Sequence, residues 1–310
     1  MKPRHAIFLA VLALTACGGG SSSSVPALPG SGSSTMTIGL VDGQLQISGD
    51  TITAVNLGID KVEVVGGGSA AAVVASYTTP DVVNILNYTS TSSPLQFTGT
   101  IPAGNYSQIR FVLDSATTTI SYIDANGVQH TDVPLAVPSA TGVGFGGNSS
   151  ADSGDGVGTA GVKVNVSVNA QSGGSEAFVV DFNAGQSIVL TGNGTFMMKP
   201  VLVATAQSAA GAITGTVKDQ AGQPVVNAEV EAMQGGTVVN AGVTDQNGNF
   251  TINALPAGTY ALSVQNQYTT QAGAQVTASG YDASVGLTLS VSGNVTVTAG
   301  QTAQAGAIVD

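Results

Sequence analysis

Cysteine and histidine, which often serve as nucleophiles, metal ligands or proton-transfer groups, are scarce in this chain. Cys17 is the single cysteine, and the two histidines are His5 and His130. One cysteine excludes a disulfide within the chain, and a zinc site would need several cysteines and histidines close together. His130 has Asp132 two residues away, which on a strand places both side chains on one face. A polar surface pair is the simpler interpretation, and a catalytic dyad is the alternative.

The residues before Cys17 have the pattern of an export signal. A short basic segment precedes an apolar run over residues 6–14, which is too short to span a bilayer as a stable helix. The chain then reads Leu14-Thr15-Ala16-Cys17, with small residues before the cysteine, and this resembles the bacterial lipobox. The resemblance implies that residues 1–16 are a lipoprotein signal peptide and that the Cys17 thiol carries a lipid with fatty acids such as palmitate. A plain secretory signal with an incidental cysteine is the alternative.

Residues 17–34, from the predicted lipidation site onward, are rich in glycine and serine. This composition is typical of a flexible tether, whose reach is roughly 23 Å. Two or three acyl chains give anchoring that is close to permanent. Gly18 follows the cysteine, where an Asp commonly retains Gram-negative lipoproteins at the inner membrane. The resemblance therefore favours the outer membrane, on its periplasmic or surface-facing side.

The charge balance restricts the partners that this chain could bind. The whole chain has a net charge of −11, and removal of the predicted signal peptide leaves five basic and eighteen acidic residues, a net charge of −13. Such a chain would repel a nucleic acid, and a basic patch for anionic lipid is not expected. We expect contact with a membrane only through the lipid on Cys17, and a polysaccharide or a protein as the possible partner.

Composition and hydrophobic periodicity predict an all-β fold. Charged residues make up 8% of the chain, against about 25% in a typical protein, and 42 residues are glycine. Valines alternate with polar residues over 162–169, as in a half-buried antiparallel strand, and the pattern recurs at 109–114 and 178–182. Asn126-Gly127 predicts a tight hairpin turn, and 81–86 is compatible with one short helical turn. We therefore expect two antiparallel β-sandwich domains.

The predicted first domain, residues 35–207, contains a series of family-like segments. In chain order they are Asp60–Val64, Val82–Leu86, Ile101–Arg110, Val180–Phe182 and Met198–Leu202. Together they resemble the domain of unknown function 4382 family, which occurs in bacterial lipoproteins. Because the activity of that family is not established, the resemblance implies a fold and a location but no reaction.

The predicted second domain, residues 211–310, carries a different set of motifs. They are Ile213–Val217, Asp219–Pro224, Asn227–Val230, Thr244–Phe250 and Leu255–Tyr260. This series resembles the carboxypeptidase regulatory-like domain, a small prealbumin-like β-sandwich, and the resemblance weakens beyond Val264. It implies a non-catalytic module, of a kind often appended to surface proteins.

One short motif occurs in both predicted domains. Ile101–Tyr106 and Leu255–Tyr260 each place Pro-Ala-Gly between an aliphatic residue and a tyrosine. Proline restricts φ, glycine permits a turn, and tyrosine starts the next strand as an amphipathic anchor. A recurrent hairpin is the first interpretation, and a shared ligand-binding tyrosine is the alternative.

Two segments partly match the sequence motif of a ligand-binding loop. The Gly-rich segment 139–161 includes a G-x-G-x-x-G spacing, but no helix follows that could hold a pyrophosphate, so we predict a flexible loop. Asp152 and Asp155 in that loop are candidate Ca²⁺ ligands, with solvated loop acids as the alternative. Residues 245–249 resemble the start of a calcium loop but lack its glycine and closing glutamate, so we predict a turn.

Three functional classes fit these observations. The first is a non-catalytic structural or interaction lipoprotein. The second is a carbohydrate-binding surface protein, which needs exposed aromatic side chains, and the candidates are Tyr77, Tyr88, Tyr268 and Tyr281. The third is a hydrolytic enzyme, but the sequence lacks a G-x-S-x-G elbow, a phosphate-binding loop and an identifiable pair of catalytic carboxylates. We therefore expect no catalytic residue and no cofactor.

Overall fold

Strands account for most of the regular structure. The computed structural model describes residues 32–42, 50–66, 71–137, 160–219, 221–265, 267–269, 275–277, 289–290, 294–305 and 308–309. Within these ranges the helical elements are the short 3₁₀ turn η1 (Ile85–Asn87) and the single turn α1 (Ala184–Ser187). The predicted all-β class is confirmed. Neither helical element is long and apolar enough to span a membrane.

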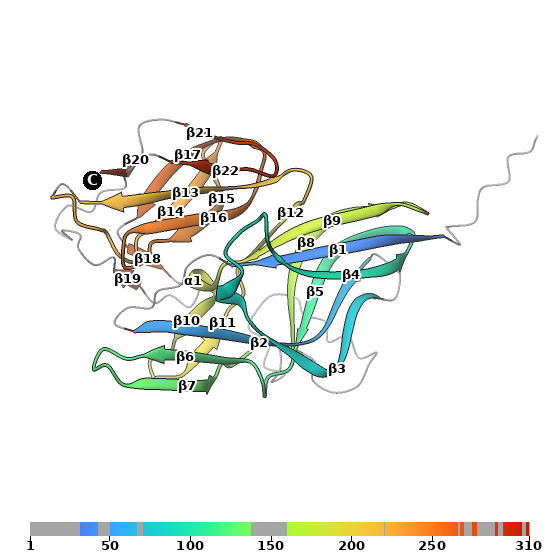
Figure 1. The fold of residues 1–310 in the computed structure, drawn as a ribbon, viewed down its shortest axis with the longest axis horizontal. Helices are drawn as coiled ribbons and strands as arrows, with labels where there is room; N and C mark the ends of the chain where they lie inside the picture. The colour runs from blue at the N-terminus through green and yellow to red at the C-terminus, as the bar shows by residue number, and fades with distance from the viewer. Residues whose placement is uncertain are drawn as a thin grey trace, which may run out of the picture.

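The first domain consists of two main sheets that pack face to face (Figure 1). Its strands are β1 (Ser33–Val41), β2 (Thr51–Val65), β3 (Ala72–Asn84), β4 (Leu95–Pro102), β5 (Gly104–Leu113), β6 (Thr119–Ile123), β7 (Gln129–Pro134), β8 (Ala160–Ala170), β9 (Ser175–Phe182), β10 (Ile188–Leu190), β11 (Phe196–Met198) and β12 (Leu202–Ala206). One sheet has the order β12-β9-β1-β4, and the other has the order β7-β6-β2-β5-β8 with β3 also paired to β2. Strands β10 and β11 form a separate pair. Most neighbouring strands are antiparallel, but β1 runs parallel to β9.

The larger hydrophobic core lies between these two sheets. Along β8, Val162, Val164 and Val168 are buried, whereas Lys163 and Asn165 are exposed. This alternation confirms the half-buried strand that the sequence predicts. Removal of such aliphatic side chains from water, at about 25 cal/mol per Å², is the main force that holds the two sheets together.

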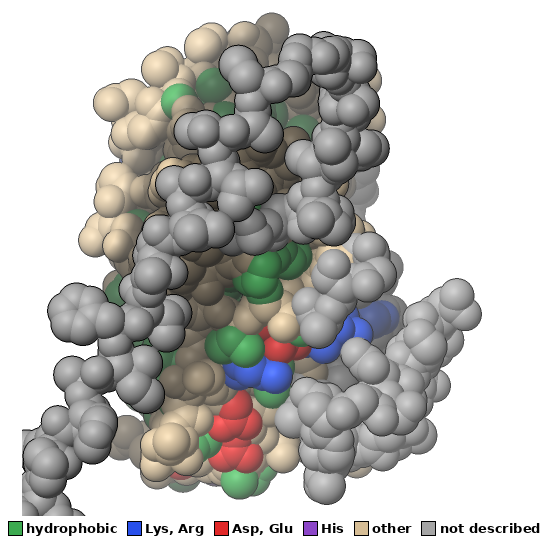
Figure 2. Space-filling view, turned by 90° about the vertical axis from the view of Figure 1, so that its right-hand side faces the viewer, with side chains coloured by type: hydrophobic (Ala, Val, Ile, Leu, Met, Phe, Trp, Pro, Cys, Tyr) green, Lys and Arg blue, Asp and Glu red, His purple; other side chains and the backbone are tan. Residues whose placement is uncertain are grey.

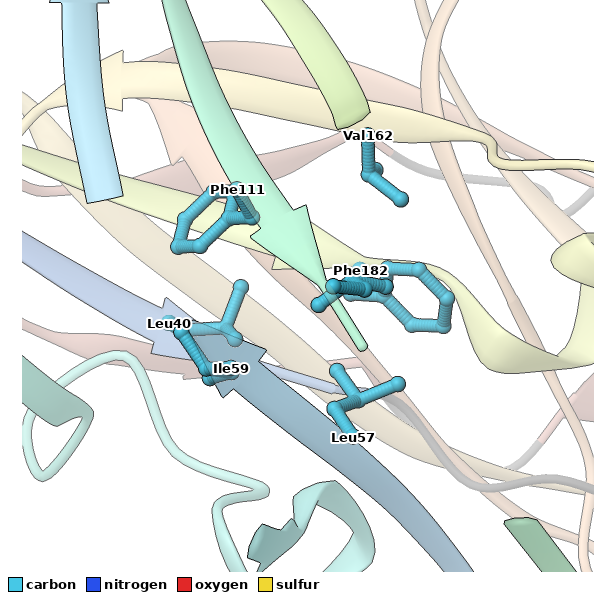
Figure 3. A pocket seen from close by; sticks show the side chains of 7 residues that line it. Leu40, Leu57, Ile59, Phe111, Val162 and Phe182 are labelled. Atoms are coloured by element: carbon cyan, nitrogen blue, oxygen red, sulfur yellow. The ribbon is translucent and has the colours of Figure 1, made fainter. Parts of the chain in front are cut away.

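A small cavity of about 10 Å³ remains inside this core (Figure 3). Its lining is entirely apolar and comes from both sheets: Leu40, Leu57, Ile59, Phe111, Leu113, Val162 and Phe182. A water molecule needs roughly 10–15 Å³ and two to four polar partners, which these side chains do not provide. The cavity is therefore a packing gap and not a ligand site.

The second domain is a smaller sandwich with its own core. Its strands are β13 (Ala210–Lys218), β14 (Glu229–Gln234), β15 (Thr237–Val243), β16 (Asn249–Pro256), β17 (Gly258–Gln265), β18 (Gln267–Thr269), β19 (Gln275–Thr277), β20 (Leu289–Ser290), β21 (Val295–Val297), β22 (Thr302–Gln304) and β23 (Ile308–Val309). One sheet has the order β16-β13-β22, with β23 also on β13. The other has the order β15-β14-β17-β20, with β21 also on β17, and β18 pairs with β19. Phe250, Tyr260 and Leu262 are buried between them.

The two domains have the same local arrangement around their first strands. β1 is antiparallel to β4 and parallel to β9, and β13 is likewise antiparallel to β16 and parallel to β22. In each hairpin the alanine between the strands donates its N–H to the carbonyl just before the first strand. Ala103 donates to Gly32 at 2.8 Å, and Ala257 donates to Ala209 at 2.7 Å.

The tyrosine of the shared motif completes this arrangement. Tyr106 donates its hydroxyl to the Pro102 carbonyl at 2.7 Å, and Tyr260 donates to the Pro256 carbonyl at 2.6 Å. Both rings are buried, and burial raises the pKa of both phenols. The motif is therefore a structural hairpin. The alternative of a shared ligand-binding tyrosine is wrong, because each hydroxyl is bonded inside its own domain.

We expect Tyr106→Phe and Tyr260→Phe each to lower the free energy of unfolding by about 1 kcal/mol. Each change leaves a proline carbonyl without its hydrogen bond but keeps the packing of the ring. Denaturation in urea, followed by circular dichroism, measures the loss. Tyr77→Phe is the matched control, because Tyr77 is exposed and should tolerate the change. Unaltered stability of both buried variants would contradict the structural role.

Strand β9 differs from the half-buried strand predicted over 178–182. Phe178, Val180 and Phe182 face the core as expected, but Val179 and Asp181 on the other face are buried as well. The reason is that the second domain packs against this outer face, where Asp181 accepts a hydrogen bond from Asn240. Alternation within one strand cannot reveal such coverage by a separate domain.

The helical turn expected within 81–86 lies further along the chain. Strand β3 continues to Asn84, and the turn η1 follows it at Ile85–Asn87. The Asn84 side chain accepts a hydrogen bond from the Leu86 N–H at 3.2 Å, which caps the turn.

Candidate functional site

Several residues that the sequence singles out lie outside the described part of the chain. They are Cys17, Asp152, Asp155 and Tyr281, together with most of the Gly-rich segment 139–161. Lipidation of Cys17 and calcium binding by the two aspartates therefore stay predictions. Tyr268 is described only as part of the backbone of β18.

The two remaining tyrosine candidates do not form an exposed aromatic platform. Tyr77 on β3 is 38% exposed, whereas Tyr88 packs against the core of the first domain. The other large apolar side chains exposed in the described ranges are aliphatic: Val73, Val82, Val128, Leu190 and Val238. A flat surface for sugar rings is therefore not present among these described tyrosines.

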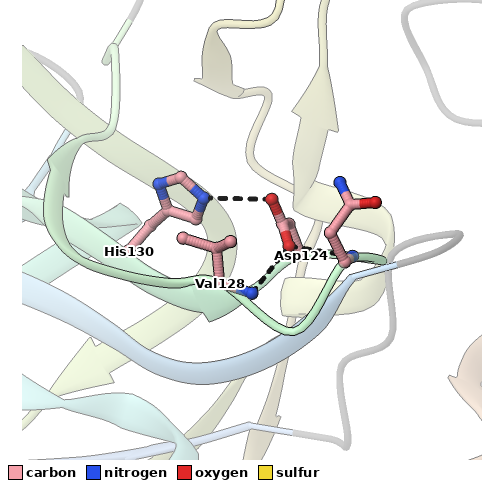
Figure 4. Close-up of polar contacts among 4 residues, drawn as sticks. Asp124, Val128 and His130 are labelled. Carbon is pink, nitrogen blue, oxygen red and sulfur yellow. Dashed lines mark hydrogen bonds and ion pairs between the residues drawn. The ribbon is translucent and has the colours of Figure 1, made fainter.

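His130 interacts with the turn that joins β6 to β7 (Figure 4). Its Nε2 lies 3.4 Å from Oδ2 of Asp124, and its ring stacks on Tyr122 with centroids 4.5 Å apart. Oδ1 of Asp124 also accepts a hydrogen bond from the Val128 N–H at 2.8 Å. The hydrogen bond from the Val128 N–H, and to a smaller extent the one from His130, lowers the pKa of Asp124 below its usual value. The predicted turn at Asn126-Gly127 is confirmed, with φ of +79° at the glycine.

Asp132 does not share a face with His130, because β7 is bulged. The pairing of β6 and β7 shifts between Ile120 and Tyr122, and Asp132 has a left-handed φ of +50°. Its carboxylate accepts hydrogen bonds from Asn56 and Thr119, each at 3.3 Å. The predicted His130–Asp132 pair is therefore wrong. The Asp-Ala-Asn-Gly turn signal in the sequence could have indicated Asp124 as the partner instead.

The calcium-like segment 245–249 forms a turn, as predicted. Oδ1 of Asp245 accepts hydrogen bonds from the N–H groups of Asn247 and Asn249, both at 2.8 Å. Gly248 has the positive φ of +75° that this turn needs. The carboxylate is thus used by the backbone of its own loop.

A charged cluster lies on the outer face of the six-stranded sheet. Glu63 is buried and contacts Nη1 of Arg110 at 3.0 Å and Nζ of Lys61 at 2.9 Å. Figure 2 shows basic and acidic side chains next to one another on one face of the molecule. Within the described ranges no three His, Cys, Asp or Glu side chains are grouped as metal ligands.

A buried polar cluster joins the two domains, and we call it the interdomain seam. Asn253 on β16 is fully buried, donates to the Asp42 carbonyl at 3.1 Å and accepts from the Thr91 hydroxyl at 3.0 Å. Asn240 on β15 donates to Oδ2 of Asp181 at 2.8 Å and to the Asn253 carbonyl at 2.9 Å. The seam thus consists of Asp42, Thr91, Asp181 and Gln186 from the first domain with Glu229, Asn240 and Asn253 from the second.

Backbone and apolar contacts surround the seam. Thr205 donates its hydroxyl to the Ala254 carbonyl at 2.6 Å, and Asn183 donates its amide to the Ala241 carbonyl at 2.7 Å. Next to these bonds is a small apolar cluster formed by both domains: Val41, Val179, Ala210 and Ala254. The two domains therefore form one continuous packed unit at this point.

Two carboxyl groups of the seam have pKa values above their usual range. Burial raises the pKa of Asp181 to about 7, although the hydrogen bond from Asn240 favours the charged form. Burial and then the neighbouring Glu231 raise the pKa of Glu229 to about 7, while the Gln186 amide opposes the rise. Both groups are therefore close to half-protonated at neutral pH.

Local sequence patterns do not indicate this cluster. Asparagine and aspartate within strands are usually solvent-facing, and nothing in the local pattern around Asp181 or Asn240 distinguishes a buried polar residue from an exposed one. The one sequence feature that could have indicated a buried carboxyl is the position of Asp181 between the apolar residues Val180 and Phe182 of β9.

Several solved bacterial structures align with parts of this chain. A candidate carbohydrate-binding protein of Pseudomonas aeruginosa is 20% identical, with 34% of this chain and 92% of that chain covered and a TM-score of 0.22. The major pilin subunit of Bacillus cereus is 14% identical, with 89% and 69% covered and a TM-score of 0.21. The minor pilin of Streptococcus agalactiae is 10% identical, with 89% and 96% covered and a TM-score of 0.22. Because these TM-scores are low, we draw no argument from the alignments.

Comparison with family models identifies both domains. The model for "Domain of unknown function (DUF4382)" matches residues 33–200, and the model for "Carboxypeptidase regulatory-like domain" matches residues 212–309. Neither description names a catalytic activity. Comparison with curated protein sequences finds no match. Since the first model covers more than half of the chain, the protein belongs to the DUF4382 family and carries a carboxypeptidase regulatory-like domain after it.

Proposed function

We propose that the protein is a non-catalytic lipoprotein that is held at the outer membrane by a lipid on Cys17 and presents two joined β-domains to a partner. The observation that carries this proposal is the sequence Leu14-Thr15-Ala16-Cys17 followed by a glycine- and serine-rich segment. That segment ends close to Ser33, where β1 begins. A tether between the lipid and the first strand accounts for both features.

The position of the seam supports presentation of the second domain away from the membrane. Strand β1 begins at Ser33, next to the tether, and ends at Val41, which packs against the second domain. At about 3.3 Å per residue, this strand separates the two points by roughly 30 Å. Figure 1 shows the second domain at the end of the first domain that is opposite to the start of β1.

Buried contacts between the domains support their action as one unit. The fully buried Asn253 bonds to three residues of the first domain, so separation of the domains would expose polar groups that are now paired. Two rigidly joined sandwiches can offer a partner a surface of fixed shape. With a net charge of −13 after signal removal, that partner is a protein or a polysaccharide and not a nucleic acid.

Membrane fractionation of the full chain in a Gram-negative host tests the proposal. We expect the protein in the outer-membrane fraction, released by detergent but not by high salt, because acyl chains are insensitive to ionic screening. Recovery in the soluble periplasmic fraction, or release by salt alone, would contradict the anchor.

A further inference from the structure

We propose that the interdomain seam is a pH-dependent joint, which is closed when Asp181 and Glu229 are protonated and loosens when they ionise. This inference goes beyond anchoring and presentation, and it does not depend on the lipid. It concerns the stiffness of the connection between the two domains.

The geometry places one carboxyl at each of two contacts between the domains. Asp181 projects from β9 of the first domain toward Asn240 of β15, and its Oδ1 is buried without a hydrogen-bond partner. Glu229 projects from β14 of the second domain and accepts a hydrogen bond from Gln186 of α1. Both side chains are at least nine-tenths buried. A negative charge at either place would be poorly solvated.

The strand neighbours and the hydrogen-bond partner of Asp181 are uncharged. Asp181 is flanked by Val41 on β1 and Val203 on β12 and is faced by Asn240 on β15. The nearest acid along these strands is Asp42, at the end of β1, whose carbonyl accepts from Asn253.

Glu229 is flanked by Val243 on β15 and Gln265 on β17, and Gln186 faces it from α1. Glu231, two residues along the same strand, adds a like charge. The acidic side chains described around the seam are Asp42, Asp181, Glu229 and Glu231, and the basic residue Lys199 adjoins α1, where its backbone N–H donates to the Ser187 carbonyl at 2.6 Å. Ionisation of the two buried groups adds repulsion as well as a desolvation penalty.

The direction of the pH effect follows from the two states. In an opened joint the carboxyls meet water and regain pKa values near 3.8 and 4.5, whereas in the closed joint both are about 7. The closed state therefore binds more protons between these values. Closure is strongest at low pH, weakens as pH rises from about 4 to about 7, and changes little above about 7. Between these values each carboxyl changes the equilibrium by up to about tenfold per pH unit.

Hydrogen exchange of the full chain, read by mass spectrometry, tests the joint. Protection factors, corrected for the intrinsic exchange rate, are compared at about pH 5.5 and about pH 8.5. We expect amides of residues 178–182 and 240–243 to lose at least tenfold in protection at the higher pH. Amides of β8, which lie away from the seam, should keep theirs and serve as the internal control.

Substitutions assign the effect to the two carboxyls. The double variant Asp181→Asn and Glu229→Gln should keep its seam protection at both pH values, since neither new amide ionises. Glu176→Gln, on β9 but outside the seam, should behave as the wild type. The proposal is overturned if seam protection in the wild type is independent of pH, if β8 loses protection in parallel, or if the double variant retains the pH dependence. The wild-type measurement remains decisive even where a variant folds poorly.

Discussion

The Cys17→Ser variant should incorporate no labelled fatty acid and should leave the membrane fraction completely. The physical reason is that the anchor needs a thioether, which a serine hydroxyl cannot form, and that no other cysteine exists in the chain to replace it. Metabolic labelling with an alkyne fatty acid, followed by click detection on a gel, measures the loss. With the acyl chains gone, a chain of net charge −11 has no electrostatic attraction to anionic lipid.

The matched control for this experiment is Ser21→Ala, a change of similar size in the tether four residues after the cysteine. Its label and its membrane fraction should equal those of the wild type. Undiminished label on Cys17→Ser would refute the lipid assignment, and equal loss in both variants would point to failed export instead.

Asn253→Ala should destabilise the full chain by about 2–4 kcal/mol. The change removes hydrogen bonds to the carbonyls of Asp42 and Thr89 and from the hydroxyl of Thr91, and it leaves the groups of Asp42 and Thr91 buried. Each orphaned group costs about 1–3 kcal/mol, partly offset where water can enter the opened seam. Equilibrium unfolding in urea measures the loss. We also expect a second, separate transition, because the coupling between the two domains is weakened.

A double-mutant cycle with Thr91→Val tests whether the loss arises across the seam. Asn253 and Thr91 are in direct contact, so their combined effect should be smaller than the sum of the single effects by about 0.5–3 kcal/mol. Asn247→Ala is the control, because Asn247 is exposed on the turn before the same strand and should lose less than about 0.5 kcal/mol. Strictly additive losses for Asn253 and Thr91 would show that the bond between them does not join the domains.

Much of the fold could be predicted because it depends on local spacing. The alternation in 162–169 selects one buried face of β8 whatever the rest of the chain does, and Asn126-Gly127 supports a hairpin through its own backbone preferences. The Pro-Ala-Gly motif before Tyr106 and Tyr260 is local in the same sense, since each hydroxyl bonds to a carbonyl four residues earlier.

The site residues could be predicted only in part. Spacing along a strand assigned His130 to Asp132, but a bulge in β7 turned Asp132 toward Asn56 and left Asp124 as the partner. A bulge inserts one extra residue into a strand, so the side chains after it lie on the opposite face from the one that simple alternation predicts. No local sequence preference in this segment indicates the bulge.

The all-β class and the order of the two families could be predicted from the sequence, because turn chemistry and hydrophobic alternation act within a few neighbouring residues. The burial of Asp181, Glu229 and Asn253 depends on how the two domains pack together. Part of the environment of each residue comes from the other domain, and burial by a surface that is distant in the chain does not change local periodicity. The same burial moves two ordinary carboxyl groups to a pKa of about 7.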